Sequence, residues 1–358
     1  AAVREIEVHF DALDGRLAAA ALLTITAALA GLLRGMLPWP RLGWIVLYAS
    51  VAAVPLALTM GVEHESMFAL PGALYWAALL AALLFALARL RSPEQKGLSL
   101  AHVALLWTLA AALGTSLHLE ARTQLLGGGW QWLALLAPLL LLMLALWRLP
   151  MRAAWPLATQ FPHYRWRWWG PALAVLALAW TISLKDPGDA QPLAFVPLLN
   201  PLELLQLGVL LVAARFAFER SLPAATRDPL RVLVAAAAFA FVTMAGLRAV
   251  HQLATDAPWS PWLLDNATAQ TTLTVLWSVL GVAAWMLGSR RRQFPVWLAG
   301  AILMGVVLAK LVLIDRQYMG NLSGILSFMA VGALLVLVGR IAPTPPRAAP
   351  VTAAGATP

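Results

Sequence analysis

The sequence predicts an all-α integral membrane protein with eleven transmembrane helices, its N-terminus outside the cytoplasm and its C-terminus inside. Three observations predict this. The chain is 61% hydrophobic and only 11% charged, whereas soluble domains are about half apolar and about a quarter charged. Apolar runs of membrane-spanning length fill it from end to end. Lys and Arg residues fall mainly on alternate connections between these runs.

The apolar runs each have about the 20 residues that a helix needs to cross a bilayer. They are apolar on all sides, whereas barrel strands are about 10 residues long and alternate apolar with polar residues. The predicted helices are 16–37, 41–62, 69–90, 98–119, 128–149, 167–184, 198–218, 230–250, 267–288, 294–314 and 322–340.

The distribution of basic residues predicts the orientation. Of the 25 Lys and Arg residues, 18 lie in the odd-numbered connections and the C-terminal tail, and 7 lie on the other side. Cytoplasmic loops of membrane proteins carry the excess of Lys and Arg. The odd-numbered connections are therefore predicted to lie in the cytoplasm.

The two ends differ from the membrane domain at 16–340. Residues 1–15 form a predicted extracytoplasmic segment, and within it 5–11 alternate apolar and polar residues as a strand does. Residues 341–358 are mainly Pro, Ala and Thr and predict a disordered cytoplasmic tail. Because residue 1 is Ala, we expect this to be part of a longer polypeptide, whose upstream part or other membrane proteins are its partners.

Composition and motifs exclude several functions. The net charge of +9 is explained by orientation in the membrane, so no nucleic-acid partner is predicted. The absence of cysteine excludes disulfides and thiolate chemistry. No HExxH, GxSxG or nucleotide-binding glycine loop occurs, and Gly127-Gly128-Gly129 is interpreted as a flexible hinge. No cofactor and no metal are predicted.

Polar and charged residues gather at the outer ends of the later helices. Charged groups in or near a bilayer are costly, so each is a functional candidate. The candidate ligand-binding residues are Glu203, Gln206, Arg248, His251, Gln270, Lys310 and Asp315, which we expect to form an outward-opening pocket. A secondary candidate is Glu63, His64 and Glu65, whose alternative is a solvated turn.

Each candidate has a structural alternative. Asn200-Pro201 with Glu203 three residues after the Asn is typical of a capped helix start, whereas Gln206 has no capping role. Arg248 shares a helix face with His251 and either snorkels to the interface or binds an anion. His251 is either a proton carrier or a simple hydrogen-bonding group.

Lys310 has two alternative directions, either toward the surface and Asp315 or inward toward Glu203. Ala301, Gly305 and Ala309 repeat every four residues beside it and predict close packing on a neighbouring helix.

The longest outer connection, 251–266, contains two Pro-Trp pairs within 258–262. This segment is predicted to lie flat at the headgroups, as an anchor or as a lid over a site. Proline is expected to block helix formation there.

Six motifs follow one another in the second half of the chain. They are Leu199–Gln206, Arg248–His251, Gln270–Trp277, Leu308–Asp315, Ile325–Gly332 and Ala342–Pro346. In this order they resemble the bacterial multi-pass membrane family catalogued as domain of unknown function 2339, over about the last 160 residues. The resemblance implies a location in a bacterial inner membrane and a much longer parent with more helices. One departure is Gly324, where the family pattern leads us to expect an Arg.

Three functions remain open. The first is a transport or cell-envelope assembly component that binds an anionic group, with Arg248 and Lys310 holding the anion while Glu203 and His251 tune charge or carry a proton. The second is an enzyme on the outer face acting on a lipid-linked sugar or acyl donor, with His251 as base. The third is a structural scaffold.

Overall fold

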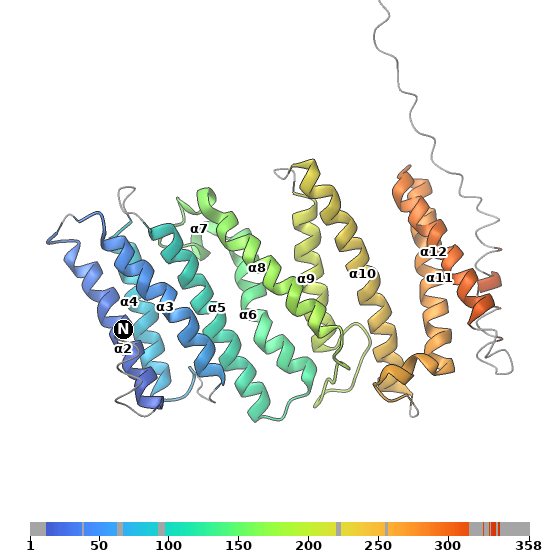
Figure 1. The fold of residues 1–358 in the computed structure, drawn as a ribbon, viewed down its shortest axis with the longest axis horizontal. Coiled ribbons are helices and arrows are strands. Elements are labelled where there is room, and N and C mark those ends of the chain that lie inside the picture. The colour runs from blue at the N-terminus through green and yellow to red at the C-terminus, as the bar shows by residue number, and fades with distance from the viewer. Residues whose placement is uncertain are drawn as a thin grey trace, which may run out of the picture. The chain divides into compact units, whose positions relative to one another are not determined.

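The computed structural model of the chain is built of helices, which confirms the predicted fold class (Figure 1). The structure describes residues 12–37, 39–62, 67–91, 97–219, 223–254 and 257–314, with a few positions between 325 and 336. No strand occurs within these ranges. The chain forms two compact units, unit 1 (1–234) and unit 2 (235–358).

Unit 1 contains the helices up to the first turns of α10. They are α2 (Ala12–Leu33), α3 (Leu42–Val62), α4 (Gly72–Arg89), α5 (Leu98–Thr123), α6 (Gly128–Arg148), α7 (Pro150–Ala153), α8 (Phe161–Ser183) and α9 (Pro201–Ala217). Unit 2 contains the rest of α10 (Ala224–Leu253), the 3-10 helix η1 (Pro261–Asp265), α11 (Ala267–Arg290) and α12 (Phe294–Leu313). Except for the short α7 and η1, each of these helices overlaps one of the first ten predicted segments, and α8 and α10 each begin six residues earlier than predicted.

Eight helices in the described part of the chain are long and apolar enough to cross a membrane, namely α2 to α6 and α10 to α12. Helix α8 begins with a segment rich in Arg and Trp, and α9 has only 17 residues. The predicted eleventh helix, 322–340, lies largely outside the described residues. The count of eleven and the orientation therefore stay predictions, as do the strand-like 5–11 and the tail 341–358, which are also outside the described ranges.

Unit 1 is held together by side-by-side helices joined by hydroxyl groups. Helix α3 packs on α5, and α5 packs on α6. The Thr115 hydroxyl donates to the Ala57 carbonyl at 3.1 Å, and the Thr108 hydroxyl lies 3.3 Å from the Ser50 carbonyl. Small hydroxyl-bearing residues let helices approach and bond within a bilayer.

The glycine run at the start of α6 is packed rather than hinge-like, which corrects the prediction. Gly127 N donates to the Gln191 carbonyl at 3.0 Å, and Gly129 N donates to the Asp189 carbonyl at 2.9 Å. A Cβ at Gly127 would lie 2.6 Å from that Asp189 oxygen. The glycines are needed because the loop between α8 and α9 lies directly against them.

In unit 2, α11 and α12 pack closely through glycines that differ from the predicted stripe. A Cβ on Gly300 would lie 2.3 Å from Trp285 N, and one on Gly288 would lie 2.2 Å from Trp297 N. Gly305 and Ala309 are exposed, and a Cβ on Gly305 would meet nothing within 4 Å. The predicted stripe is thus wrong, because the face of α12 that turns to α11 carries Gly300 instead.

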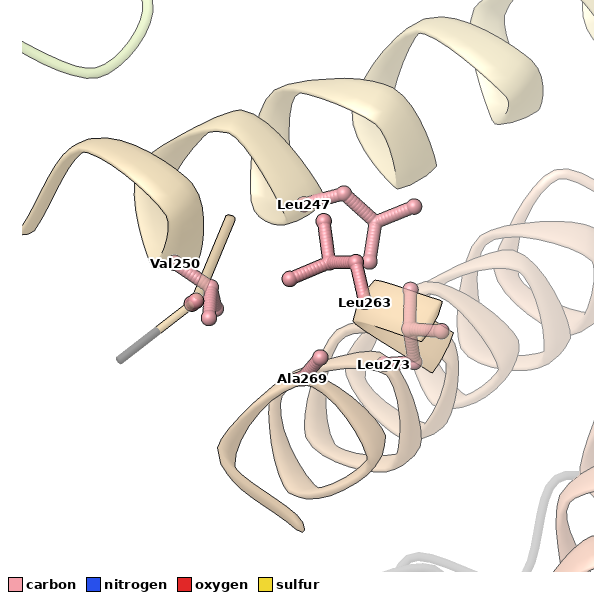
Figure 2. Close-up of a cluster of buried hydrophobic side chains, with 6 residues drawn as sticks. Leu247, Val250, Leu263, Ala269 and Leu273 are labelled. Atoms are coloured by element: carbon pink, nitrogen blue, oxygen red, sulfur yellow. The ribbon is translucent and has the colours of Figure 1, made fainter. Parts of the chain in front are cut away.

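A buried apolar cluster joins α10, η1 and α11 (Figure 2). It contains Leu247, Val250, Ala257, Leu263, Ala269 and Leu273. Leu263 belongs to η1, where Pro261 stands at the first position of a 3-10 helix. The prediction that proline keeps helix out of this connection is therefore wrong, because a first-turn proline needs no backbone N–H.

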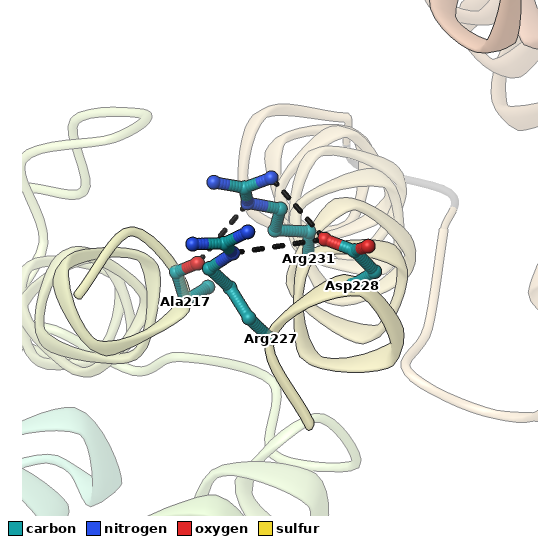
Figure 3. Close-up of polar contacts among 4 residues, drawn as sticks. All are labelled: Ala217, Arg227, Asp228 and Arg231. Carbon is teal, nitrogen blue, oxygen red and sulfur yellow. Dashed lines mark hydrogen bonds and ion pairs between the residues drawn. The ribbon is translucent and has the colours of Figure 1, made fainter. Parts of the chain in front are cut away.

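The end of α9 is tied to the start of α10 within unit 1 (Figure 3). Arg231 Nε donates to the Ala217 carbonyl at 3.1 Å, and its NH1 lies 3.3 Å from Asp228 Oδ1. Arg227 Nε is 3.8 Å from the same carboxylate oxygen. Arg231 thereby supplies a donor to the last turn of α9, whose carbonyls have no partner within the helix.

Candidate functional site

The start of α9 is organised by Asn200 and Glu203, in agreement with the capped helix start. Asn200 Oδ1 accepts a hydrogen bond from Glu203 N at 3.0 Å, and Pro201 occupies the first turn. The Glu203 carboxylate accepts from Leu198 N, two residues before the cap. Both side chains are buried. These contacts give Glu203 a structural role in fixing the loop that leads into α9.

Gln206 joins α9 to α8 through a network of hydrogen bonds. Its Nε2 donates to Ser183 Oγ at 2.8 Å, and that hydroxyl donates to the Trp180 carbonyl at 2.7 Å. The Trp180 indole N–H donates back to the Gln206 carbonyl at 3.2 Å. Buried polar groups linked in this way stabilise and orient the helices that carry them. Gln206 therefore holds two helices together.

Arg248 is completely buried near the end of α10, with 0% of its surface exposed. Its neighbours in sequence, Leu247 and Val250, belong to the apolar cluster of unit 2. Burying a guanidinium costs several kcal/mol before compensation by its surroundings. Enclosure within the protein argues against the snorkelling alternative, in which the guanidinium leaves the protein for the interface.

His251 is half-buried one turn after Arg248, and it is held by the connection that follows α10. Its Nδ1 lies 2.6 Å from the Ala257 carbonyl, and its ring centre is 5.6 Å from that of Trp259. Because a carbonyl oxygen can only accept, Nδ1 carries the proton. In the neutral ring, Nε2 is then the acceptor, which is the form needed by a general base.

Lys310 crosses from α12 to α11. Its Nζ donates to Thr274 Oγ1 at 2.7 Å and to the Gln270 carbonyl at 3.2 Å, and only 8% of the residue is exposed. The Gln270 side chain donates in turn to the Leu264 carbonyl of η1. Lys310 therefore turns inward, but onto α11 and not onto the predicted partner Glu203, which belongs to the other unit.

The predicted site residues are distributed over both units. Glu203 and Gln206 belong to unit 1, whereas Arg248, His251, Gln270 and Lys310 belong to unit 2. Among them, Lys310 donates a hydrogen bond to the Gln270 carbonyl. The gathering of all six in one pocket stays a prediction. Asp315 and the secondary set Glu63, His64 and Glu65 lie outside the described residues.

Unit 1 contains a cleft that the sequence did not predict. It has a volume of about 240 Å³ and is lined by His118, Gly128, Gln131, Trp132, Leu135 and Asp186. One sequence signal for this cleft was the position of His118 at the end of the predicted helix 98–119. The approach of Asp186 had no such signal, because it depends on how the loop after α8 folds. In the described part of the chain, no three His, Asp or Glu residues are placed to hold a metal ion.

Comparison with known proteins places this architecture in a family. The profile of the family described as "Predicted membrane protein (DUF2339)" matches residues 10–345. The chain belongs to this family. The match to the DUF2339 profile covers nearly the whole chain, so the resemblance extends far upstream of the last 160 residues.

The DUF2339 assignment agrees with a multi-pass helical protein embedded in a lipid bilayer. No curated protein and no solved structure gave a significant match. The family description names no reaction.

Proposed function

We propose that this membrane protein is a bacterial inner-membrane component of transport or cell-envelope assembly, and that unit 2 binds an anionic group from the outer side. The observation that carries the proposal is the burial of two basic side chains, Arg248 and Lys310, in one small unit. Ionisable groups within membrane helices are rare and usually functional, because they are costly to bury.

The two cations have complementary chemistry. Arg presents a planar fork of donors that matches a carboxylate or phosphate, whereas Lys acts as a point charge with three donors. The bonds from Lys310 to Gln270 and Thr274 fix the ammonium group in place before a ligand arrives. A preorganised cation loses less side-chain entropy on binding than a mobile one.

A second candidate function, an enzyme on the outer face acting on a lipid-linked sugar or acyl donor, is favoured by the geometry of His251. The Ala257 carbonyl holds the ring with Nε2 as acceptor. A histidine oriented by one ring nitrogen with the other available as a base is the arrangement used in general base catalysis. Arg248, three residues earlier on the same helix, would stabilise negative charge on a substrate phosphate.

The experiment measures anion binding by the full chain in phosphatidylcholine nanodiscs, with phosphate and pyrophosphate as probes in calorimetry. Arg248→Gln and Lys310→Gln are each expected to weaken binding by about tenfold or more, the effect of losing one charged hydrogen bond. Arg291→Gln is the matched control because Arg291 is an exposed basic residue after α11. It should bind like the wild type.

Folding and function are separated by Arg248→Lys and Lys310→Arg, which retain the charge and are checked by thermal unfolding. If the Gln variants fold and bind both anions as the wild type does, the anion site does not exist. Flux of phosphate or pyrophosphate across proteoliposome membranes would favour transport. Binding of these anions without flux would favour envelope assembly. Release of a product from a lipid-linked donor that His251→Ala abolishes would favour the enzyme.

A further inference from the structure

The cleft of unit 1 lies where α5 ends, α6 begins and the loop after α8 returns. Its volume of about 240 Å³ is smaller than the roughly 300–1,000 Å³ of sites for drug-sized ligands. It therefore suits one small group, such as a single ring. By the predicted orientation it opens outside the cytoplasm, at the level of the lipid headgroups.

Asp186 is fixed in this cleft by two donors. Trp132 Nε1 donates to Asp186 Oδ2 at 3.0 Å, and Gly188 N donates to Oδ1 at 2.8 Å. A Cβ on Gly128 would lie 3.1 Å from Oδ2, so a glycine at this position leaves room for the carboxylate. The carboxylate is thus held in one place, with oxygens that act as hydrogen-bond acceptors.

His118 and Gln131 are also oriented by backbone carbonyls. His118 Nδ1 lies 3.1 Å from the Gln131 carbonyl, so Nδ1 carries the proton and Nε2 of the neutral ring is an acceptor. Gln131 Nε2 donates to the Leu126 carbonyl at 2.9 Å. This bond orients the side-chain amide, whose Oε1 is a hydrogen-bond acceptor. Three residues of the cleft lining, Asp186, His118 and Gln131, thus carry acceptor atoms.

The lining also defines which ligands are unsuitable. Among the described residues that line the cleft there is no Lys or Arg, and Asp186 contributes a negative charge. An anion would meet no cationic side chain in this lining. Trp132 and Leu135 supply apolar surface beside the acceptors.

We propose that this cleft binds a hydroxyl-rich group, namely one sugar residue. Sugar hydroxyls donate to the carboxylate, imidazole and amide acceptors, while the C–H face of the ring packs on apolar surface from Trp132 and Leu135. Three dispersed acceptors match several hydroxyls around a ring better than the single focus of an ammonium group. The sugar is either a free saccharide or the head of a glycolipid, which present the same chemistry. This site is separate from the anion site of unit 2.

The test uses the full chain in phosphatidylcholine nanodiscs, without sugar-based detergent. Saturation-transfer NMR is recorded with the methyl glycosides of glucose, galactose, mannose and N-acetylglucosamine, and with ethanolamine as an ammonium probe. A second arm adds monoglucosyl diacylglycerol and counts retained glycolipid by native mass spectrometry. A signal from a free glycoside, or retained glycolipid, supports the proposal and assigns the source.

Two substitutions of one residue give the sharpest comparison. His118→Asn retains an N–H near the position of Nδ1 for the Gln131 carbonyl but removes the Nε2 acceptor, and it should weaken sugar binding by about tenfold. His118→Gln retains an acceptor near the position of Nε2 and should weaken it less. Asp186→Asn should also weaken binding, whereas Asp189→Asn should not, because Asp189 lies on the same loop outside the cleft lining.

The proposal is overturned if no glycoside and no glycolipid binds, if ethanolamine alone gives a signal, or if Asp189→Asn weakens sugar binding as much as Asp186→Asn does. Thermal unfolding of each variant separates a lost site from a lost fold. Anion binding in unit 2 is unaffected by these variants, so failure here is distinguishable from failure of the proposed function.

Discussion

Unit 1 and unit 2 differ in the kinds of polar group that they bury. In unit 1, Gln206, Ser183 and Trp180 form a network of neutral hydrogen bonds between α8 and α9. In unit 2 the buried polar groups include the cations Arg248 and Lys310. Neutral networks hold membrane helices together at modest cost, whereas buried cations are costly and are retained for function. Gln206 and Ser183 therefore have structural roles in unit 1, as does the buried carboxylate of Glu203 through its contact with the loop before α9. Arg248 and Lys310 of unit 2, by contrast, are candidates for function.

The close helix contacts of the two units also differ. In unit 2, α11 and α12 meet through Gly288 and Gly300 at backbone contact distance. In unit 1, α3 and α5 are joined by threonine hydroxyls, and a Cβ on Gly114 of α5 would meet the backbone of one residue of α6, Leu135. Substitutions at these contacts should therefore affect unit 2 most.

The largest effect is expected for Gly300→Ala. The new Cβ would lie 2.3 Å from Trp285 N and 2.7 Å from the Gly281 carbonyl, so two backbone segments of α11 must shift. We expect a loss of about 3 kcal/mol of unfolding free energy, measured by SDS titration in mixed micelles. Gly305→Ala is the control, since its Cβ would meet nothing. Equal stability of the two variants would contradict the α11–α12 packing.

Gly114→Ala should cost about 2 kcal/mol in the same titration. Its Cβ would lie 2.4 Å from the Leu135 carbonyl of α6, a single backbone contact. Gly208→Ala should cost less, because its Cβ would meet only the flexible Leu140 side chain at 2.8 Å. If Gly208→Ala is the more damaging of the pair, the α5–α6 contact is not the one described.

Removal of a helix cap should cost less unfolding free energy than the glycine substitutions. The cost should be greater for the cap in unit 1 than for the cap in unit 2. Asn200→Ala is expected to cost about 1 kcal/mol, because Asn200 is buried and caps Glu203 N. Asn266→Ala removes the equivalent cap of α11, where Asn266 is half-buried and accepts from Thr268 N and Ala269 N. Water can replace part of that second cap. A greater loss for Asn266→Ala would reverse the expected order.

The smallest effect is expected for Asp228→Asn at the α9–α10 junction. Its ion pairs with Arg227 and Arg231 are largely exposed, and such pairs contribute about 0–1 kcal/mol. Arg231→Gln should cost more than Asp228→Asn, because Arg231 also donates to the Ala217 carbonyl. Thermal unfolding at low and high salt would check this, since only the ion-pair contribution is screened.

The fold class could be predicted from the sequence because long apolar runs leave a helix as the favoured local solution in a bilayer. The cap at Asn200 was predictable for a similar reason, since its partner is three residues away. The stripe at Ala301, Gly305 and Ala309 was predicted wrongly, because small-residue spacing occurs on more than one face of α12 and does not reveal which face a neighbour covers. The prediction that proline would block helix formation at Pro261 was also wrong, because proline can begin a helical turn as well as end one.

The sequence by itself determined the membrane class, the helix segments and the short-range caps, because these depend on composition and on residues within one or two turns. Only the tertiary structure decided that Lys310 turns onto Gln270 and Thr274, and that Asp186 meets Trp132. These partners are 36 to 54 residues apart. Nothing in local periodicity encodes such a meeting, which depends on how helices pack and how the loops between them return.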